Sequence, residues 1–233
     1  MLAGSFDRGY RCHLWNLEVG RAYVPIDLSY PRERLNYMES SAKLELLITT
    51  SSRATLFENQ SKLLKLDTSD SLLAAQSEVN PNSLATGDNL IYVIFTSGST
   101  GQPKAAAVYH RGFSNLIHWF VNEFQITDHD RCLLVSSLSF DLTQKNLYAT
   151  LLVGGTLHLY PSGPYDISSL STLIRQHSIS LINCTPSAFY PLIEPFDDSM
   201  AQNMESLRIA FLGRRANFSV ASQTLDHASD KPR

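Results

Sequence analysis

The segment IYVIFTSGSTGQPKAAAVYH, residues 91–110, decides the fold class because two kinds of sequence meet in it. Its first six residues are apolar, aromatic or β-branched, which is typical of a buried strand. Residues 96–104, TSGSTGQPK, then supply two glycines, four hydroxyl side chains and one lysine. Because glycines let a ligand approach the backbone, and amides, hydroxyls and an ammonium all bind anions, this loop predicts a polyphosphate site.

Two known glycine-containing motifs do not match this segment. A Walker A loop requires G-x-x-x-x-G-K-[ST], whereas here Gln102 and Pro103 separate Gly101 from Lys104, and Ala105 follows the lysine. A nucleophile elbow requires G-x-S-x-G, which GSTG does not supply. The chain is therefore neither an ordinary P-loop NTPase nor an α/β-hydrolase, and a ligand-free solvent loop stays open as the alternative.

The rest of the chain predicts an α/β fold. Short apolar runs, typical of strands in a sheet covered on both faces, alternate with amphipathic segments typical of helices. The predicted strands span residues 44–50, 89–96, 131–137, 156–160, 179–185 and 207–213, and the predicted helices span residues 30–42, 110–124, 142–153 and 167–177. Strands separated by helices of this length indicate a largely parallel sheet, and residues 67–89 predict a surface crossing between two strands.

Local signals support several of these helices. Asp166 is a predicted N-cap, and Gly154 with Gly155 closes the helix before them. In the helix over residues 110–124, apolar side chains recur at three- and four-residue spacing and predict a core face. That predicted core stripe consists of Phe113, Leu116, Ile117, Trp119, Phe120 and Phe124.

Composition narrows the class of protein. The 233 residues are 43% hydrophobic and 18% charged, with a formal net charge of -3 and scattered basic residues, so neither nucleic acid nor a membrane is an expected partner. No apolar run reaches the roughly 18 residues needed to span a bilayer, and we expect a cytoplasmic protein. Cys12, Cys132 and Cys184 lie far apart and predict ordinary thiols, with neither a disulfide framework nor a zinc site.

The loop at residues 96–104 resembles the phosphate-binding signature of the adenylate-forming, AMP-binding enzymes. Three further stretches are similar, in the expected order, to adenylation domains of nonribosomal peptide synthetases: AYVPIDLSYPRERLNYM at 22–38, FDLTQKN at 140–146 and INCTPSAFYPLI at 182–193. The resemblance covers roughly residues 15–228, with core motifs over 22–213 and a poor match over 1–14 and 229–233. It implies that residues 1–233 are a partial adenylation domain: an α/β, partial N-terminal large domain of the adenylate-forming fold, with mostly parallel sheets flanked by helices.

The activity that the resemblance implies is that of a ligase in secondary metabolite biosynthesis. ATP and an amino acid give an aminoacyl adenylate and pyrophosphate with Mg2+. The acyl group then passes to the phosphopantetheine thiol of a carrier domain. The implied partners are therefore ATP, the amino acid, and the carrier and condensation domains of a parent peptide synthetase.

The resemblance also assigns roles in the phosphate loop. The residues implied to bind ATP are Thr96, Ser97, Gly98, Ser99, Thr100, Gly101 and Lys104. Lys104 is the implied catalytic contact with the phosphates and the leaving pyrophosphate, where preorganised positive charge stabilises the transferring group. The family usually has a glycine after this lysine, and Ala105 departs from that pattern.

A second group of residues is implied to bind the amino acid. Asp141 aligns with the aspartate that pairs with the α-ammonium, although its position before a helical pattern also suits an N-cap. Leu142, Lys145 and Asn183 align with the side-chain pocket. A lysine there favours a polar or acidic substrate such as glutamate or aspartate, because an ammonium is costly to bury against an apolar group; the alternative is a solvated helix lysine.

Some of the family's pattern is missing. Gly213, Arg214 and Arg215 stand where the family has a Gly-Gly-Glu sequence, and the later elements that bind adenine, ribose and Mg2+ do not follow. We therefore expect little self-sufficient catalysis from the chain. A noncatalytic remnant that binds nucleotide or a partner and an acyl-CoA synthetase-like ligase are the alternatives, and Asp141 argues against the latter.

Overall fold

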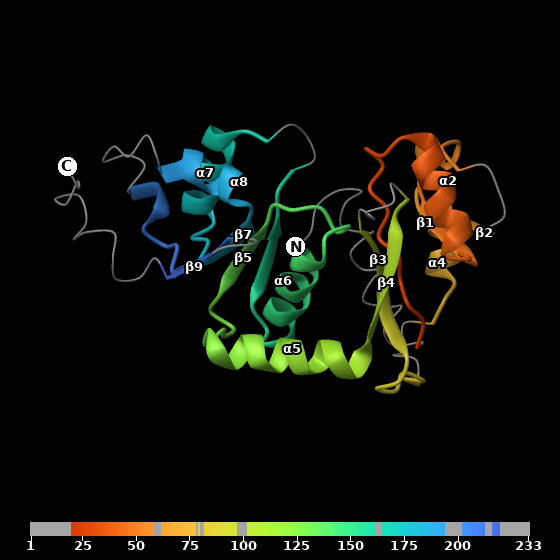
Figure 1. Ribbon diagram of the computed structural model, residues 1–233, viewed down its shortest axis with the longest axis horizontal. Coiled ribbons are helices and arrows are strands. Elements are labelled where there is room, and N and C mark those ends of the chain that lie inside the picture. Colours follow the sequence, from red (N-terminus) through yellow and green to blue (C-terminus); the bar gives the residue numbers. More distant parts are fainter. Residues whose placement is uncertain are drawn as a thin grey trace. The chain divides into compact units, whose positions relative to one another are not determined.

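The computed structural model describes residues 20–57, 62–77, 79, 82–96, 102–161, 165–193 and 202–212, and the backbone of residues 216–219. The chain divides into two compact units, Met1–Asn115 and Leu116–Arg233 (Figure 1). The division falls within the long helix α5 (His110–Glu123). Within the described residues, no helix combines the length and the hydropathy that crossing a membrane requires.

The first unit begins with a helix and a small parallel sheet. Helix α2 (Arg32–Ser41) follows Pro31, which occupies the N-cap position, and buries Leu35 and Met38, which lie one turn apart. Strand β1 (Leu46–Thr49) pairs in parallel with β2 (Lys62–Lys65), and the short helix α3 (Ser51–Ala54) connects them. The predicted surface crossing contains a short helix, α4 (Asp70–Ala74), with no buried residue.

A strand pair leads into and out of the glycine and hydroxyl loop. Strand β3 (Leu90–Thr96) pairs antiparallel with β4 (Lys104–Tyr109) and forms a separate sheet, so its assignment to a parallel sheet was wrong. The reason is the short connection: residues 97–103 can reverse the chain directly, whereas a parallel neighbour needs a crossover of a dozen or more residues. An isolated parallel bridge also joins Tyr23 to Tyr92.

The second unit contains a five-stranded sheet in the order β6-β5-β7-β8-β9. The first four strands are parallel and β9 is antiparallel to β8, which confirms the α/β prediction. The strands are β5 (Arg131–Leu134), β6 (Thr156–Leu159), β7 (Leu181–Cys184), β8 (Ile209–Leu212) and β9 (Ala216–Ser219), and the helices are α6 (Asp141–Leu152), α7 (Ile167–Gln176) and α8 (Pro186–Ile193) (Figure 1).

The two faces of this sheet have different surroundings. Residues paired in parallel register point to the same face, so Leu133, Ile182 and Ala210 share one face and belong to a core cluster with residues of α7 and α8. Leu134, Asn183 and Phe211 are likewise in register and share the opposite face. Helix α6 packs against β5, β6 and β7.

The ends of two helices follow the sequence signals. Asp166 is the N-cap of α7 and accepts a hydrogen bond from the amide of Ser169 at 2.7 Å, as predicted. Gly154 has a φ of 82° directly after α6, a conformation that favours glycine.

The apolar face of α5 is narrower than predicted. Phe113, Ile117 and Phe120 are buried, but Leu116 is exposed and Trp119 is 51% exposed. One helix face of about 100° cannot bury all six apolar positions. Trp119 packs edge to face on Phe124 with ring centroids 5.9 Å apart, so the prediction of a core role for Leu116 and Trp119 was wrong.

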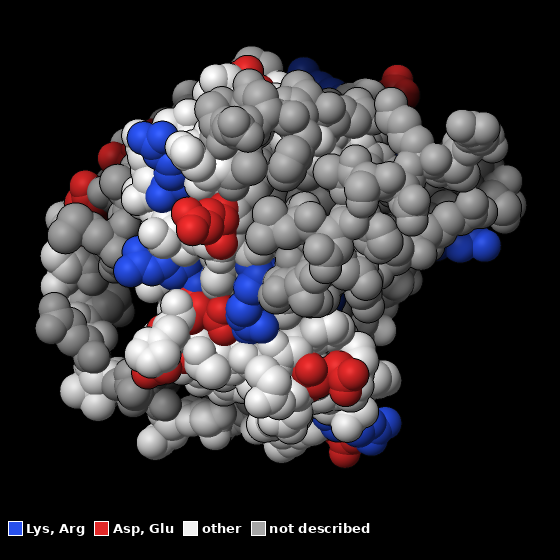
Figure 2. Space-filling view, turned by 90° about the vertical axis from the view of Figure 1, so that its left-hand side faces the viewer, with Lys and Arg blue, Asp and Glu red and all other residues white. Residues whose placement is uncertain are grey.

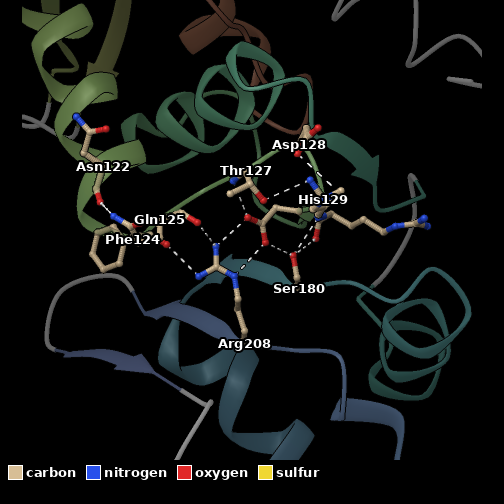
Figure 3. Close-up of polar contacts among 10 residues, drawn as sticks. Asn122, Phe124, Gln125, Thr127, Asp128, His129, Ser180 and Arg208 are labelled. Carbon is tan, nitrogen blue, oxygen red and sulfur yellow. Dashed lines mark hydrogen bonds and ion pairs between the residues drawn. The ribbon is translucent and has the colours of Figure 1, made fainter.

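One polar network ties the end of α5 to the sheet of the second unit (Figure 3). The Arg208 guanidinium donates to the Asp130 carboxylate at 2.8 and 3.0 Å and to the carbonyls of Phe124 and Gln125 at 2.9 and 3.1 Å. The Ser180 hydroxyl also donates to Asp130 at 2.7 Å. Burial alone would raise the pKa of Asp130, but these donors and the Thr127 amide together hold that pKa below its ordinary value.

Charged side chains on the described surface are mixed in sign. On the face drawn in Figure 2, Lys and Arg lie beside Asp and Glu instead of gathering into a patch of one sign. The exposed ion pairs Arg21–Glu45 and Arg111–Asp88 are further examples of this mixing.

Candidate functional site

The first part of the candidate site is the loop between β3 and β4 in the first unit. Thr96 and Lys104 are register partners, and the Thr96 hydroxyl donates to the Lys104 carbonyl at 3.4 Å. Both residues are exposed. The other predicted phosphate-binding residues, Ser97, Gly98, Ser99, Thr100 and Gly101, lie outside the described residues. The structure therefore places the two ends of the loop side by side at the end of a strand pair.

The exit of the loop is held by a residue that sequence reasoning did not single out. The Tyr37 hydroxyl, on α2, donates to the carbonyl of Pro103 at 3.2 Å. The Tyr37 ring also packs edge to face on Phe95, with centroids 6.4 Å apart. Tyr37 lies in the segment at 22–38 that resembles adenylation domains, so the resemblance could have singled it out. Among the described residues, no carboxylate lies within ion-pairing distance of Lys104.

The second part of the candidate site lies in the second unit, where α6 begins. Phe140 occupies the N-cap position, and Asp141 is the first helical residue. The exposed Asp141 carboxylate accepts the amide of Leu142 at 2.7 Å. The N-cap alternative for Asp141 was therefore wrong, because the cap position belongs to the residue before it.

Lys145 lies one turn further along α6 and points into an aromatic environment. Its Nζ atom is 5.1 Å from the ring centroid of Phe120 and 5.4 Å from that of Phe211. Burial lowers the pKa of Lys145 to about 8, and the charge interactions with Cys132 and Asp141 oppose this shift. Lys145 is half-buried, so its side chain combines contact with these rings and contact with solvent.

The Cys132 thiol interacts electrostatically with Lys145. Burial raises the pKa of Cys132 to about 12, so the thiol stays protonated near neutral pH. Cys132 and Cys184 are both free and buried, whereas Cys12 lies outside the described residues. Among the described residues, no group of three His, Cys, Asp or Glu side chains could hold a metal ion.

Asn183 lies on β7 with an unsatisfied side chain. It is 2% exposed, and neither its amide oxygen nor its amide nitrogen has a hydrogen-bond partner within the described part of the chain. Its register partner is Phe211, so Asn183 leaves the sheet on the face that also carries the ring beside Lys145. The structure therefore brings Lys145 and Asn183 to one face.

The positions of Leu142 and His110 add no further contact to this group of residues. Leu142 is half-buried, and its carbonyl accepts a hydrogen bond from Asn146 at 3.1 Å, while no hydrogen bond or ring contact among the described residues links it to Lys145 or Asn183. His110 is the first residue of α5 and burial lowers its pKa.

Phe120 and Phe211 were not predicted as parts of the site. Phe120 was predicted only as a core residue of α5, and Phe211 lay within an apolar strand run. No local pattern marks a ring that will lie beside a lysine from another element, because that contact depends on sheet order. With these rings included, the second part of the site combines a carboxylate, an ammonium, an amide and two aromatic walls.

Comparison with known proteins identifies the family of this chain. Residues 16–228 match the model of the family described as AMP-binding enzyme. Surfactin synthase subunit 2 of Bacillus subtilis (strain 168) is 33% identical over 199 residues, which cover 84% of this chain and 6% of that protein. The chain therefore spans a small part of the curated relatives that it matches.

Solved structures show the same fold. The AMPPNP-bound form of the nonribosomal peptide synthetase FmoA3 superposes with a TM-score of 0.76 at 28% sequence identity, covering 87% of this chain and 21% of that chain. The N-terminal subdomain of NpsA from Klebsiella oxytoca superposes with a TM-score of 0.72 at 22% identity, covering 86% of this chain and 51% of that chain. The described architecture is thus a partial N-terminal portion of this α/β fold, and with its family match over residues 16–228 the chain belongs to the AMP-binding enzymes.

Proposed function

We propose that this chain is part of an adenylation domain that activates an amino acid with ATP for nonribosomal peptide synthesis, in the cytoplasm. The observation that carries the proposal is the TSGSTGQPK loop, whose ends meet at Thr96 and Lys104 on neighbouring strands. A relative named surfactin synthase and a similar structure that holds AMPPNP support both halves of the proposal, the peptide product and the nucleotide.

The proposed reaction transfers an adenylyl group. An oxygen of the amino acid's carboxylate attacks the α-phosphorus of ATP, and the bond from that phosphorus to the bridging oxygen breaks, releasing pyrophosphate. Lys104 stabilises the charge that accumulates on the leaving phosphates, with Thr96 and residues 97–101 as further donors. Mg2+ would reduce the charge of the triphosphate; the described residues supply no metal-ligand cluster, so we assign it no protein ligand.

The amino acid is proposed to bind in the second unit. Asp141 accepts the α-ammonium, because a carboxylate makes strong charge-assisted hydrogen bonds to such a group. Leu142, Lys145 and Asn183 line the pocket for the substrate's side chain. In the complete protein the aminoacyl group then passes to the phosphopantetheine thiol of a carrier domain, next to a condensation domain.

Nucleotide binding by the folded chain tests this proposal. Isothermal titration with ATP and Mg2+ is expected to give saturable binding, and Lys104→Met is expected to weaken it by about tenfold, the loss of one charge-assisted phosphate contact. Lys62→Met is the matched control, because Lys62 is an exposed lysine at the start of another strand of the same unit.

Two results would contradict the proposal. One is the absence of ATP binding by a chain that melts cooperatively, and the other is an equal effect of the two substitutions. ATP binding without amino-acid-dependent pyrophosphate exchange would instead favour the noncatalytic nucleotide-binding alternative.

A further inference from the structure

The first observation concerns two opposite charges on α6 that do not meet. Asp141 and Lys145 are four residues apart, about 6 Å along the helix axis, a spacing at which a carboxylate and an ammonium commonly pair. Here they form no ion pair. The Asp141 carboxylate accepts the Leu142 amide, and the Lys145 ammonium lies beside the rings of Phe120 and Phe211.

The second observation is that no acceptor among the described residues binds the Lys145 ammonium. Aromatic faces attract a cation, but they do not replace the three acceptors that an ammonium binds in water. Within the described part of the chain, no hydrogen bond or ion pair of Lys145 is present. Lys145 is half-buried, so its charge is partly removed from water, and an anion that enters beside it would offset that cost.

The third observation comes from a different element. Asn183 on β7 is almost fully buried with both amide atoms unpartnered, and it shares its sheet face with Phe211, one wall of the Lys145 environment. Buried amides without partners are rare in folded proteins, and each requires an explanation. Asn183 lies near the carboxyl end of its strand, the end at which ligands bind in parallel α/β sheets.

From these observations we infer that the amino acid bound here carries a second carboxylate, as glutamate and aspartate do, and that Lys145 and Asn183 bind it. This inference rests on the proposed function and names the substrate class of its pocket. The ammonium of Lys145 and the amide NH2 of Asn183 both donate to the side-chain carboxylate, while Asp141 accepts from the α-ammonium.

Charge and spacing together select this class. A carboxamide side chain could satisfy Asn183 but would leave the Lys145 charge unpaired, and an apolar side chain would satisfy neither. The α-carboxylate is consumed in the reaction with ATP, so a carboxylate at Lys145 must be a second one. The positive and negative ends of a dicarboxylic amino acid are a few bonds apart, which suits an anion and a cation one helical turn apart.

The test is a binding panel on the full folded chain, measured by ligand-observed NMR with L-aspartate, L-glutamate, L-glutamine and L-norvaline. Glutamate or aspartate is expected to bind about tenfold more tightly than glutamine, and Lys145→Met is expected to remove that difference. Lys145→Arg should retain it because the charge remains. Arg175→Met is the control, since Arg175 is an exposed cation of the same unit.

A second variant distinguishes a ligand role for Asn183 from a purely structural one. Asn183→Leu is nearly isosteric and removes the unpartnered amide, so it should raise the melting temperature while weakening glutamate binding severalfold. Unchanged glutamate binding in this variant would overturn the role of Asn183.

The outcomes separate this inference from the proposed function. ATP binding together with a preference for glutamine or norvaline, or with a preference that Lys145→Met leaves intact, overturns the inference and leaves the proposed function standing. ATP binding with no amino acid bound also overturns it. Failure of ATP binding by a folded chain contradicts the proposed function itself.

Discussion

Lys145 is held in a place that lysine rarely occupies. The side chain is half-buried, and its ammonium lies beside two phenyl rings. The sequence allowed both a pocket and a solvated position for Lys145, because helical periodicity says nothing about which side chains from β8 will lie opposite. Sheet order places Phe211 beside the lysine.

The lowered pKa of Lys145 predicts how amino acid binding depends on pH. The ammonium is protonated below its pKa of about 8, so glutamate affinity should be constant from about pH 6 to 7.5 and fall above pH 8, towards tenfold per unit. Cys132 and Asp141 are the titratable groups that interact with Lys145, and the Cys132 thiol stays neutral in this range. The measurement is glutamate titration across this pH range.

Folding stability should respond in the opposite direction. In the unfolded chain the pKa of Lys145 returns to 10.5, so between about pH 8 and 10.5 the unfolded state binds more protons and the contribution of this group to stability rises. Lys145→Arg provides the control for both effects, because its guanidinium does not titrate here. A fall in affinity near pH 8 that persists in Lys145→Arg would contradict this assignment.

Arg208 is the second residue whose removal has a calculable effect. Arg208→Met leaves the carboxylate of Asp130, which is 4% exposed, without its cationic partner, and we expect the free energy of unfolding to fall by about 3 kcal/mol. Because Arg208 keeps the pKa of Asp130 low, the stability that it contributes should be lost as pH falls through that lowered pKa.

Urea unfolding at pH 7 and at acid pH measures this effect. Arg175→Met removes the same charge from an exposed position and should change stability by less than about 0.5 kcal/mol. Equal losses in the two variants would show that net charge, and not the network of Arg208, is responsible.

At the scale of elements, two glycines differ in the space around them: one position has room for a Cβ atom and the other has none. Gly112 lies within α5, where an added Cβ would meet nothing within 4 Å. Gly155 lies between α6 and β6, where an added Cβ would be 2.9 Å from the Asp130 carbonyl oxygen and 3.0 Å from Thr150. The first glycine only lowers helix propensity, whereas the second permits a close approach of two backbone segments.

Alanine substitutions should therefore change stability with opposite signs. Gly112→Ala is expected to raise the free energy of unfolding by about 0.5 to 1 kcal/mol, through helix propensity and a less flexible unfolded chain. Gly155→Ala is expected to lower it by about 1 to 3 kcal/mol, because backbone must move. Urea denaturation of the three proteins is the measurement, and a tolerated Gly155→Ala would disprove the close approach.

The elements that sequence reasoning found are those with long periodic patterns or clear ends. Helix α5, helix α7 with its Asp166 cap and the strands of the parallel sheet are examples. It missed β2 and α8, since short segments carry little periodic signal and α8 contains Pro191. The polar residues Asp141, Lys145 and Asn183 could be named from local similarity, but their aromatic surroundings depend on contacts across elements.

At the scale of the whole molecule, the chain consists of two compact units, and the second depends on its last described strands. Strand β7 lies between β5 and β8, and Arg208, just before β8, contacts residues at the end of α5. A chain shortened to end at residue 205 would lack β8 and the cationic partner of Asp130. The rest of the second unit then has an open sheet edge and a buried carboxylate that no cation neutralises.

Hydrogen exchange measured by mass spectrometry should show this dependence. In the shortened chain, amides of β5, α6 and β7 are expected to lose most of their protection, because local stability follows buried contacts. Amides of β1 and β2 serve as an internal reference for the first unit. Protection of β7 equal to that in the full chain would contradict the dependence on β8.

The contact between Arg208 and the carbonyl of Phe124 joins groups that are 84 residues apart in the chain. During synthesis, at roughly 5 to 20 residues per second, the ribosome takes on the order of ten seconds to add the residues between them. Throughout that interval the end of α5 and the carboxylate of Asp130 lack Arg208, which has not yet been synthesised. The nascent chain is thus open to chaperones, and to premature association with other chains, for a period set by translation speed.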